Sequence, residues 1–206
     1  MRLLDLSHPI TSGMPVWPGD PEVALLPAAS TVTHGYNLLS VHLGSQTGTH
    51  VDAPFHVDDA LPTLDQIPLE RFTGPAVVAD LRGQEGAIRA EDLDDLDLRQ
   101  GAVLLLCTGW SQYWGTPRYA EHPWLDPTAA RLLLGTGVRT VGIDAPSIDR
   151  PGDPALPSHH LLARAGAVIA ENLTNLDAVP TGAQIWLLPL PLAGADGAPT
   201  RAVAVF

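Results

Sequence analysis

The amino-acid sequence predicts a mixed α/β fold with many strands and few helices, built as one domain over residues 1–206. Ala102–Cys107 is an apolar run of the kind that forms a strand buried on both faces. Asp126 and Pro127 then open a helix, because Asp is a favoured N-cap and Pro suits the first helical position. Arg139–Asp144 is the following apolar strand. This strand–helix–strand order predicts a right-handed parallel crossover.

Before this crossover, the chain predicts short strands separated by loops rich in Pro and Gly. A first strand within residues 2–10 is stopped by Pro9, and residues 12–21 form a loop. Acidic residues gather in residues 90–98, which we expect to form a short helix with a solvated face. Further strands are expected at 22–26, 37–43 and 76–81.

The helix within the crossover is expected to end at Gly135, since Gly readily terminates a helix. After the crossover, the sequence predicts one more helix and three strands. Ser158 can cap a second helix that contains His159–Ala165 and ends at Gly166. The strands are expected at Val168–Glu171, 184–189 and 200–206.

The charge of the chain and the length of its apolar runs argue against two classes of partner. The formal net charge is −12, and the 11 Lys and Arg residues form no run. Nucleic-acid binding needs clustered basic residues, so we expect no nucleic-acid partner. No apolar run approaches the roughly 18 residues that a membrane-spanning helix needs, so we expect no membrane partner.

The amino terminus and the single cysteine bear on location. Residues 1–8 contain an acid, Asp5, and lack the apolar core of a secretion signal, so a cytoplasmic location is expected. Cys107 is the one cysteine and cannot form an internal disulfide, which is consistent with a reducing compartment. Its place after three leucines favours packing over catalysis.

The segment from Gln46 to His56 carries the strongest chemical signal. On an extended segment, His50 and Asp52 are two residues apart and point to the same face. Pro54 should end that strand and leave His56 on a turn that folds back toward the pair. An imidazole and a carboxylate on one face, with a second imidazole nearby, suit a metal site with an adjacent acid/base group. The alternative is an ordinary polar loop.

Glu171 is a second unusual feature after the Gln46–His56 segment, because this carboxylate ends the apolar run that begins at Ala165. A carboxylate there is unfavourable unless it is neutralised or bound to a cation. His159 starts the preceding helix, and a helix start can meet the end of the next strand across the sheet edge. Mixed imidazole and carboxylate ligands suit Zn²⁺ or Mn²⁺. Spacing alone leaves His159 and the adjacent His160 as alternatives.

These features resemble the cyclase family of metal-dependent hydrolases, which includes bacterial kynurenine formamidase and isatin hydrolase. The resemblance extends through nearly the whole chain in the family's order, and the motif around His50 is its most specific part. The matching segments are Asp5-Leu-Ser-His-Pro9, Trp17-Pro-Gly-Asp20, Thr47–His56, Gly142–Ser147, His159 to Glu171, and Gly197–Ala202.

The resemblance implies a site for one or two divalent metal ions, Zn²⁺ or Mn²⁺. By the family's pattern, His50, Asp52, His159 and Glu171 would be metal ligands, and His56 would be the catalytic acid/base.

The family pattern also bears on two neighbouring choices. The family's spacing of 12 residues to Glu171 selects His159 over His160. Gln46 stands where the family has its first metal-binding His, so we treat it as a tentative ligand. Its amide oxygen is a weaker and harder ligand than imidazole, which predicts either loss of a second metal or a preference for Mn²⁺ over Zn²⁺.

The resemblance further implies a β/β/α arrangement of the swivelling type, a homodimer, and hydrolysis of an amide bond in a small aromatic substrate. Metal-activated water would attack the carbonyl, and His56 would pass a proton to the leaving nitrogen. An arylformamidase that converts N-formylkynurenine to kynurenine and formate is the leading hypothesis. The alternatives are hydrolysis of isatin or another cyclic amide or ester, and a homologue that binds metal or ligand without catalysis.

Aromatic residues provide candidates for a substrate wall. Trp17 lies in a Pro-rich loop, where it could stack on an aromatic ligand or pack onto the core. The resemblance places Trp17 at a position that contacts substrate. Trp110 and Trp114 could complete the wall.

Overall fold

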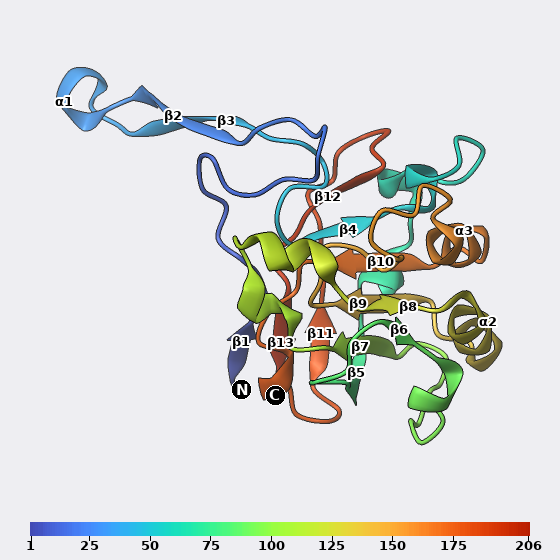
Figure 1. Cartoon of the computed structure of the whole chain (residues 1–206). Coiled ribbons are helices and arrows are strands. Elements are labelled where there is room, and N and C mark those ends of the chain that lie inside the picture. Colours follow the sequence, from blue (N-terminus) through green and yellow to red (C-terminus); the bar gives the residue numbers. More distant parts are fainter.

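The computed structural model describes residues 1–206 and is centred on a nine-stranded mixed sheet (Figure 1). In spatial order its strands are β1 (Leu3–Asp5), β13 (Val203–Val205), β11 (Gln184–Trp186), β5 (Thr73–Asp80), β7 (Val103–Cys107), β9 (Thr140–Ile143), β10 (Val168–Glu171), β4 (His50–Asp52) and β12 (Gly197–Pro199). Neighbours from β5 to β10 pair in parallel, and all other neighbours pair antiparallel. The mixed α/β fold class is confirmed.

Two further strand pairs lie outside this sheet. β2 (Ala24–Ala29) and β3 (Leu38–His42) form a hairpin with the short helix α1 (Thr31–His34) at its tip. This hairpin, which we call the arm, projects away from the body of the molecule (Figure 1). β6 (Ala87–Ile88) pairs in parallel with β8 (Trp124–Leu125). The strands expected at 22–26 and 37–43 are present, but the sequence did not indicate that they would leave the sheet.

β7 separates the two apolar cores of the protein. Val103, Leu105 and Cys107 point into one core, whereas Leu104 and Leu106 point into the other. All five side chains are buried, as the apolar run predicted for a central parallel strand. The buried position of Cys107 agrees with a packing role.

Helices cover one of the two cores. α2 (Pro127–Thr136) and α3 (Pro157–Arg164) lie side by side on the same face of the sheet (Figure 1). α2 buries Ala129 and Leu133 against this face. The parallel pairing of β7 with β9 confirms the parallel order of the predicted crossover. No helix is long and apolar enough to cross a bilayer.

The start of α2 is as predicted, but the glycine that ends it is Gly137, two residues after the predicted Gly135. The Asp126 carboxylate accepts a hydrogen bond from the Thr128 backbone N–H at 2.8 Å. Gly135 was expected to end the helix, but it remains helical. The helix ends at Thr136 because Gly137 takes a left-handed conformation, with φ of 90°.

The predicted cap of α3 is wrong. Ser158 lies inside the helix, and its hydroxyl donates to the Leu125 carbonyl at 2.8 Å. The Asp149 carboxylate, from the preceding loop, accepts the backbone N–H groups of Ser158 and His159 at 2.8 and 2.9 Å. A carboxylate distant in the sequence therefore satisfies the helix start in place of a local N-cap.

Two other expectations also need correction. The helix expected at 90–98 is wrong, because only Ala90–Asp92 forms a single 3₁₀ turn. Asp92 accepts the Arg89 N–H at 2.7 Å, as at a helix start, but the four Asp residues between 92 and 97 have low helix propensity and the turn does not continue. β12, beside β4, was not expected.

The stability of α2 provides a test of its N-cap. Replacing Asp126 with Ala should lower the free energy of unfolding by about 1 kcal/mol, because the Thr128 backbone N–H and hydroxyl lose their acceptor. Asp126→Asn, which keeps a side-chain oxygen, should lose much less. Urea unfolding with an unchanged m-value would measure both differences.

The same comparison should depend on pH. Hydrogen bonds from Thr128 lower the pKa of Asp126 below its ordinary value of 3.8. The contribution of Asp126 is therefore fully present above pH 3.8 and is lost as the pH falls through its lowered pKa. Equal stabilities of the wild type and Asp126→Ala at neutral pH would contradict the assignment.

Candidate functional site

The candidate site forms where β4 lies antiparallel to β10. The register places His50 directly opposite Glu171, so these two side chains share a face of the sheet. Asp52, two residues after His50 on the same strand, shares that face as the sequence predicted. α3 packs over this face and directs His159 back toward the strands. All four side chains are buried.

The four groups converge on one point. The Nε2 atom of His50 lies 3.4 Å from Asp52 Oδ1 and 3.5 Å from Glu171 Oε2. The Nε2 atom of His159 lies 3.6 Å from Asp52 Oδ2 and 3.3 Å from Glu171 Oε1. Ligand atoms of His50, Asp52 and Glu171 all lie within 4.8 Å of one another. Two imidazole nitrogens thus face two carboxylates, and His159, not His160, occupies this position.

Each imidazole is oriented through its other nitrogen. The Nδ1 atom of His50 lies 2.7 Å from the Gly48 carbonyl oxygen. The Nδ1 atom of His159 lies 2.8 Å from Asp149 Oδ2. Because these oxygens accept a proton-bearing Nδ1, both Nε2 atoms are left to face the carboxylates. This arrangement is typical of metal-ligating histidines.

The donor set fits a divalent cation. Both carboxylate oxygens of Asp52 are buried and have no hydrogen-bond partner. Buried polar atoms without partners are rare, and buried carboxylates are normally paired or bound to a metal. Imidazole nitrogen with carboxylate oxygen is a common ligand set for transition metals. The arrangement could therefore hold a metal ion, as its sequence suggested.

The pKa shifts of His50 and Asp52 agree with a cation-binding site. Burial lowers the pKa of His50, but hydrogen bonds and charges from Asp52 and Glu171 outweigh it and raise that pKa to about 10. Burial raises the pKa of Asp52, yet contact with His159 and His50 brings it well below its usual range. The two carboxylates thus draw positive charge into the site, as two protons or as one divalent cation.

His56 lies beside this cluster, on the 3₁₀ turn Pro54–His56. Its ring centroid is 5.8 Å from that of His159, and its side chain is 29% exposed. The Nδ1 atom of His56 lies 3.2 Å from Asp196 Oδ2. Burial lowers the pKa of His56, but the hydrogen bond to Asp196 outweighs it and raises the pKa above its ordinary value. The turn after Pro54 therefore brings His56 back toward the pair, as expected.

Gln46 contacts His56 rather than the four-residue cluster. Its Nε2 donates to Asp196 Oδ2 at 2.8 Å and lies 3.3 Å from His56 Nδ1. Its Oε1 is buried without a hydrogen-bond partner. The structure thus places Gln46 beside His56 and Asp196, with one unpartnered oxygen.

Three residues in the surroundings of the site were missed from the sequence. Asp149, Asn172 and Asp196 all lie in loops or at strand ends, where no periodic pattern marks them. Asn172 has a positive φ of 55°, and its Nδ2 donates to the Gly48 carbonyl at 2.9 Å. The signal that could have found it is its position directly after Glu171.

The aromatic wall is only partly as expected. Trp17 is 47% exposed, so the alternative that it packs onto the core is wrong. Trp110 is buried, and its indole N–H donates to the Tyr119 carbonyl at 3.0 Å, which makes it a core residue. Trp114 stacks on His8, with ring centroids 4.1 Å apart.

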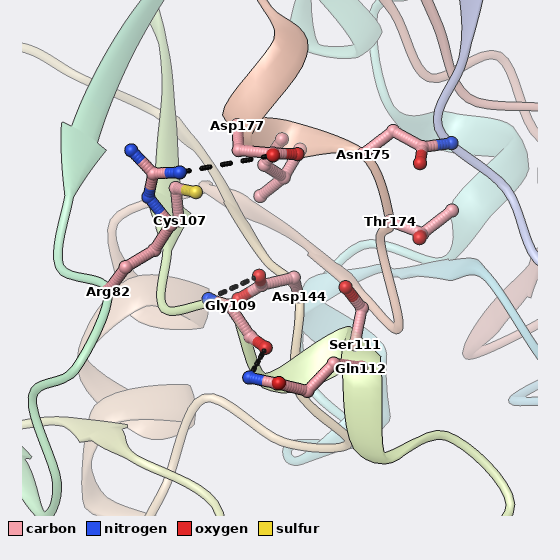
Figure 2. A pocket seen from close by; sticks show the side chains of 10 residues that line it. Arg82, Cys107, Gly109, Ser111, Gln112, Asp144, Thr174, Asn175 and Asp177 are labelled. Carbon is pink, nitrogen blue, oxygen red and sulfur yellow. Dashed lines mark hydrogen bonds and ion pairs between the residues drawn. The ribbon is translucent and has the colours of Figure 1, made fainter.

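A cavity of about 380 Å³ lies away from the four converging residues, at the carboxyl ends of β5, β7 and β9 (Figure 2). Its buried carboxylate, Asp144, already accepts hydrogen bonds from Thr108 and Gly109. Cys107 also lines it, and burial raises the pKa of this thiol to about 12, which makes a nucleophilic role unfavourable. None of the candidate metal ligands lines this cavity.

Comparison with known proteins identifies the family. Residues 4–150 match the family model Cyclase, described as "Putative cyclase". A kynurenine formamidase of Salinibacter ruber is 35% identical over 211 residues, covering 98% of this chain and 97% of that protein. Isatin hydrolase A from Labrenzia aggregata, solved with benzyl benzoate, superposes with a TM-score of 0.90 at 27% identity, over 98% and 93% of the two chains. A structure described as a potential metal-dependent hydrolase with cyclase activity is 33% identical, with a TM-score of 0.82 over 98% and 96%. The chain therefore belongs to the cyclase family of metal-dependent hydrolases.

Proposed function

We propose that this protein is a metal-dependent amide hydrolase of the arylformamidase type, which releases formate from N-formylkynurenine. The observation that carries the proposal is the buried cluster of two imidazoles and two carboxylates, in which the Asp52 oxygens have no hydrogen-bond partner. The full-length similarity to kynurenine formamidase of Salinibacter ruber supports the substrate class.

In this proposal, His50, Asp52, His159 and Glu171 hold one divalent cation, Zn²⁺ or Mn²⁺. When bound, such a cation polarises a carbonyl oxygen and lowers the pKa of water. The buried carboxylates balance its charge, and the Nδ1 partners of the two imidazoles fix their orientation. Gln46 as a ligand and a second ion stay predictions: the Gln46 amide N–H is engaged by Asp196, so its unpartnered Oε1 is the atom that would coordinate.

His56 would carry the proton. Asp196 accepts only, so it holds the proton of neutral His56 on Nδ1 and leaves Nε2 free to accept one. Nε2 would then donate that proton to the leaving nitrogen as the amide bond breaks. The partial exposure of His56 suits this role, because the ring must reach both substrate and solvent.

Hydrolysis of isatin or a related cyclic amide is the second candidate. The close superposition with isatin hydrolase A supports it. Values of kcat/KM for N-formylkynurenine and isatin, measured with each metal, would separate the two. A preference for isatin would replace the substrate assignment without changing the reaction type.

The remaining expectations stay predictions. These are the single domain over residues 1–206, the homodimer and the cytoplasmic location.

Metal removal should destabilise the protein. Returning Zn²⁺ or Mn²⁺ at about 100 times its Kd to the chelated protein should add about 2.7 kcal/mol, because the ion binds the folded state. That gain corresponds to a rise in Tm of about 5–10 °C for a chain of this size. Thermal unfolding with and without metal is the measurement.

Asp52→Asn is the matched control for this effect. It keeps the shape of the side chain but removes the charge, so the rise in Tm with metal should disappear. A wild-type protein that binds neither ion and shows no rise would contradict the metal site.

Replacing His56 with Ala should lower kcat by about 10²–10⁴-fold, since the reaction loses its proton carrier. Metal content and Tm should change little, because His56 lies outside the ligand set. His42→Ala, which removes an exposed imidazole on β3, should leave kcat unchanged. An undiminished kcat in His56→Ala would remove His56 from the mechanism.

A hydrogen-bond chain behind His50 should affect metal affinity. The buried Tyr119 hydroxyl donates to Asn172 Oδ1 at 2.9 Å, and Asn172 in turn donates to the Gly48 carbonyl that orients His50. Tyr119→Phe leaves the Asn172 oxygen unpaired and should weaken metal binding by about 10-fold.

Competition with a chromophoric chelator would measure this affinity without an activity assay. Tyr113→Phe is the control, because it makes the same change in a tyrosine whose ring packs on Trp110, away from Asn172. Equal affinities of the two variants would show that the chain does not position His50.

A further inference from the structure

A polar cavity of about 380 Å³ lies at the carboxyl ends of the parallel strands β5, β7 and β9, away from the four candidate metal ligands (Figure 2). Ligand pockets typically measure roughly 300–1,000 Å³, and in α/β sheets they lie outside the carboxyl ends of the strands. Of its ten lining residues only Cys107 and Leu176 are hydrophobic. The proposed hydrolase mechanism uses none of them. The cavity therefore has the size and the location of a further binding site, and its polarity indicates a polar ligand.

Asp144 is a buried negative charge in this cavity. It directly follows β9 and is 2% exposed. Its carboxylate accepts the backbone N–H groups of Thr108 and Gly109 at 2.9 and 2.8 Å, but it forms no ion pair with an Arg, Lys or His. Burial raises the pKa of Asp144 above its ordinary value, although these hydrogen bonds oppose the shift. A buried carboxylate is unfavourable without a positive partner, so this residue would stabilise a cation in the cavity.

Asp177 adds a second negative charge, at the solvent side of the cavity. Its side chain is 57% exposed, and its one cationic neighbour, Arg82 Nη1, lies 3.9 Å away, beyond hydrogen-bond distance. Arg82 is held instead by Asp80, which accepts Arg82 Nε at 2.8 Å and Nη2 at 2.6 Å. Asp80 thus balances the charge of Arg82 from outside the lining. The charges of Asp144 and Asp177 are left without a counter-charge.

Two amide side chains of the lining offer acceptors. Gln112 Nε2 donates to the Gly109 carbonyl at 2.8 Å, and Asn175 Nδ2 donates to the Asp5 carbonyl at 2.9 Å. Because a carbonyl oxygen can only accept, these bonds fix which end of each amide is nitrogen and leave both amide oxygens available. The lining therefore combines acceptor oxygens with excess negative charge. A matching ligand must supply N–H donors and positive charge.

We propose that the cavity binds a small organic cation through a primary ammonium group, with Asp144 and Asp177 as its charged partners. A primary ammonium has three N–H donors and no acceptor, which matches this lining. An organic cation fits better than a metal ion, because the only His, Cys, Asp or Glu residues whose ligand atoms converge are His50, Asp52 and Glu171. The inference does not depend on the hydrolase activity.

The cavity lies close to the proposed hydrolase site, and this affects the choice of variants. Asn172, which follows Glu171, donates its backbone N–H to the carbonyl of Ala145, next to Asp144, at 2.9 Å. A substitution of Asp144 can therefore disturb the segment that carries Glu171. Asp177 is exposed, so Asp177→Asn removes a charge from the cavity without changing this segment.

Three small probes test the ligand class. Ethanolamine carries an ammonium group, L-serine carries an ammonium and a carboxylate, and ethylene glycol carries no charge. Titrations at neutral pH and constant ionic strength are followed by the backbone amide signals of Thr108 and Gly109 in NMR spectra, because both amides donate to Asp144. Ethanolamine should shift both signals saturably, and ethylene glycol should not.

The two ammonium probes also distinguish the source of the ammonium. Tighter binding of L-serine would identify an amino acid as the ligand, whereas tighter binding of ethanolamine would identify a simple amine. Either result supports the ammonium site. The absence of a saturable shift with both probes, or an equal shift with ethylene glycol, would overturn the proposal.

Two variants and a matched control test the charged partners. Asp177→Asn should raise the Kd of ethanolamine about 3-fold, as expected for the loss of an exposed ion pair. Asp144→Asn should raise it about 10-fold or more, because a buried charged acceptor is lost. Asp95→Asn, which removes the same charge from an exposed residue outside the cavity, should bind as the wild type does. Wild-type affinity in Asp177→Asn would contradict the assignment, whether or not Asp144→Asn folds.

Metal content and kcat, measured on the same samples, separate this cavity from the proposed hydrolase site. Asp177→Asn and Asp95→Asn should keep both values of the wild type, since neither residue belongs to the metal ligands or to the proton carrier. Weaker ethanolamine binding with unchanged metal content therefore assigns the effect to the cavity. A wild-type protein that binds ethanolamine but neither metal would overturn the proposed function and leave this inference standing.

Discussion

Two buried carboxylates on one face of the sheet are the constraint on which the rest of the site depends. Asp52 and Glu171 lie on adjacent strands, β4 and β10, and both contact the same two imidazole nitrogens. Such a pair is strongly unfavourable in the protein interior without compensating positive charge. Antiparallel pairing brings the carboxylates together, and α3 closes the site from above with His159. The fold therefore stabilises a concentration of negative charge that a cation can neutralise.

The three histidines of the site are oriented in the same way but differ in solvent exposure. Each has its Nδ1 near an oxygen acceptor, namely the Gly48 carbonyl for His50, Asp149 for His159 and Asp196 for His56. This fixes the tautomer and leaves Nε2 available. His50 and His159 are buried, which suits the proposed ligands of an enclosed ion, whereas His56 is partly open to solvent, which suits the proposed proton carrier.

Local patterns in the sequence predict what lies within one element. The alternation of His50 and Asp52, the N-cap at Asp126 and the buried strand β7 depend on neighbouring residues, and all three appear in the structure. Contacts between distant segments leave no such pattern. Asp196 is 140 residues from His56, and Asp149 caps α3 from outside the helix, so neither has a local signature. The arm was visible as two strands, but its departure from the sheet is a tertiary property.

Gln46, which stands where the family resemblance leads us to expect a metal-binding His, takes part in the hydrogen bonding of Asp196 and His56. Its Nε2 can only donate, and it shares Asp196 Oδ2 with the Nδ1–H of His56. The hydrogen bond from His56 and that from Gln46 lower the pKa of Asp196 well below its usual range, although burial opposes them. The anionic Asp196 in turn raises the pKa of His56. An imidazole at position 46 would compete with His56 for protons, whereas an amide donates at every pH. Gln46 therefore acts on His56, the proposed proton carrier, through their shared partner Asp196, and its unpartnered Oε1 is the atom left to meet a cation or a substrate donor.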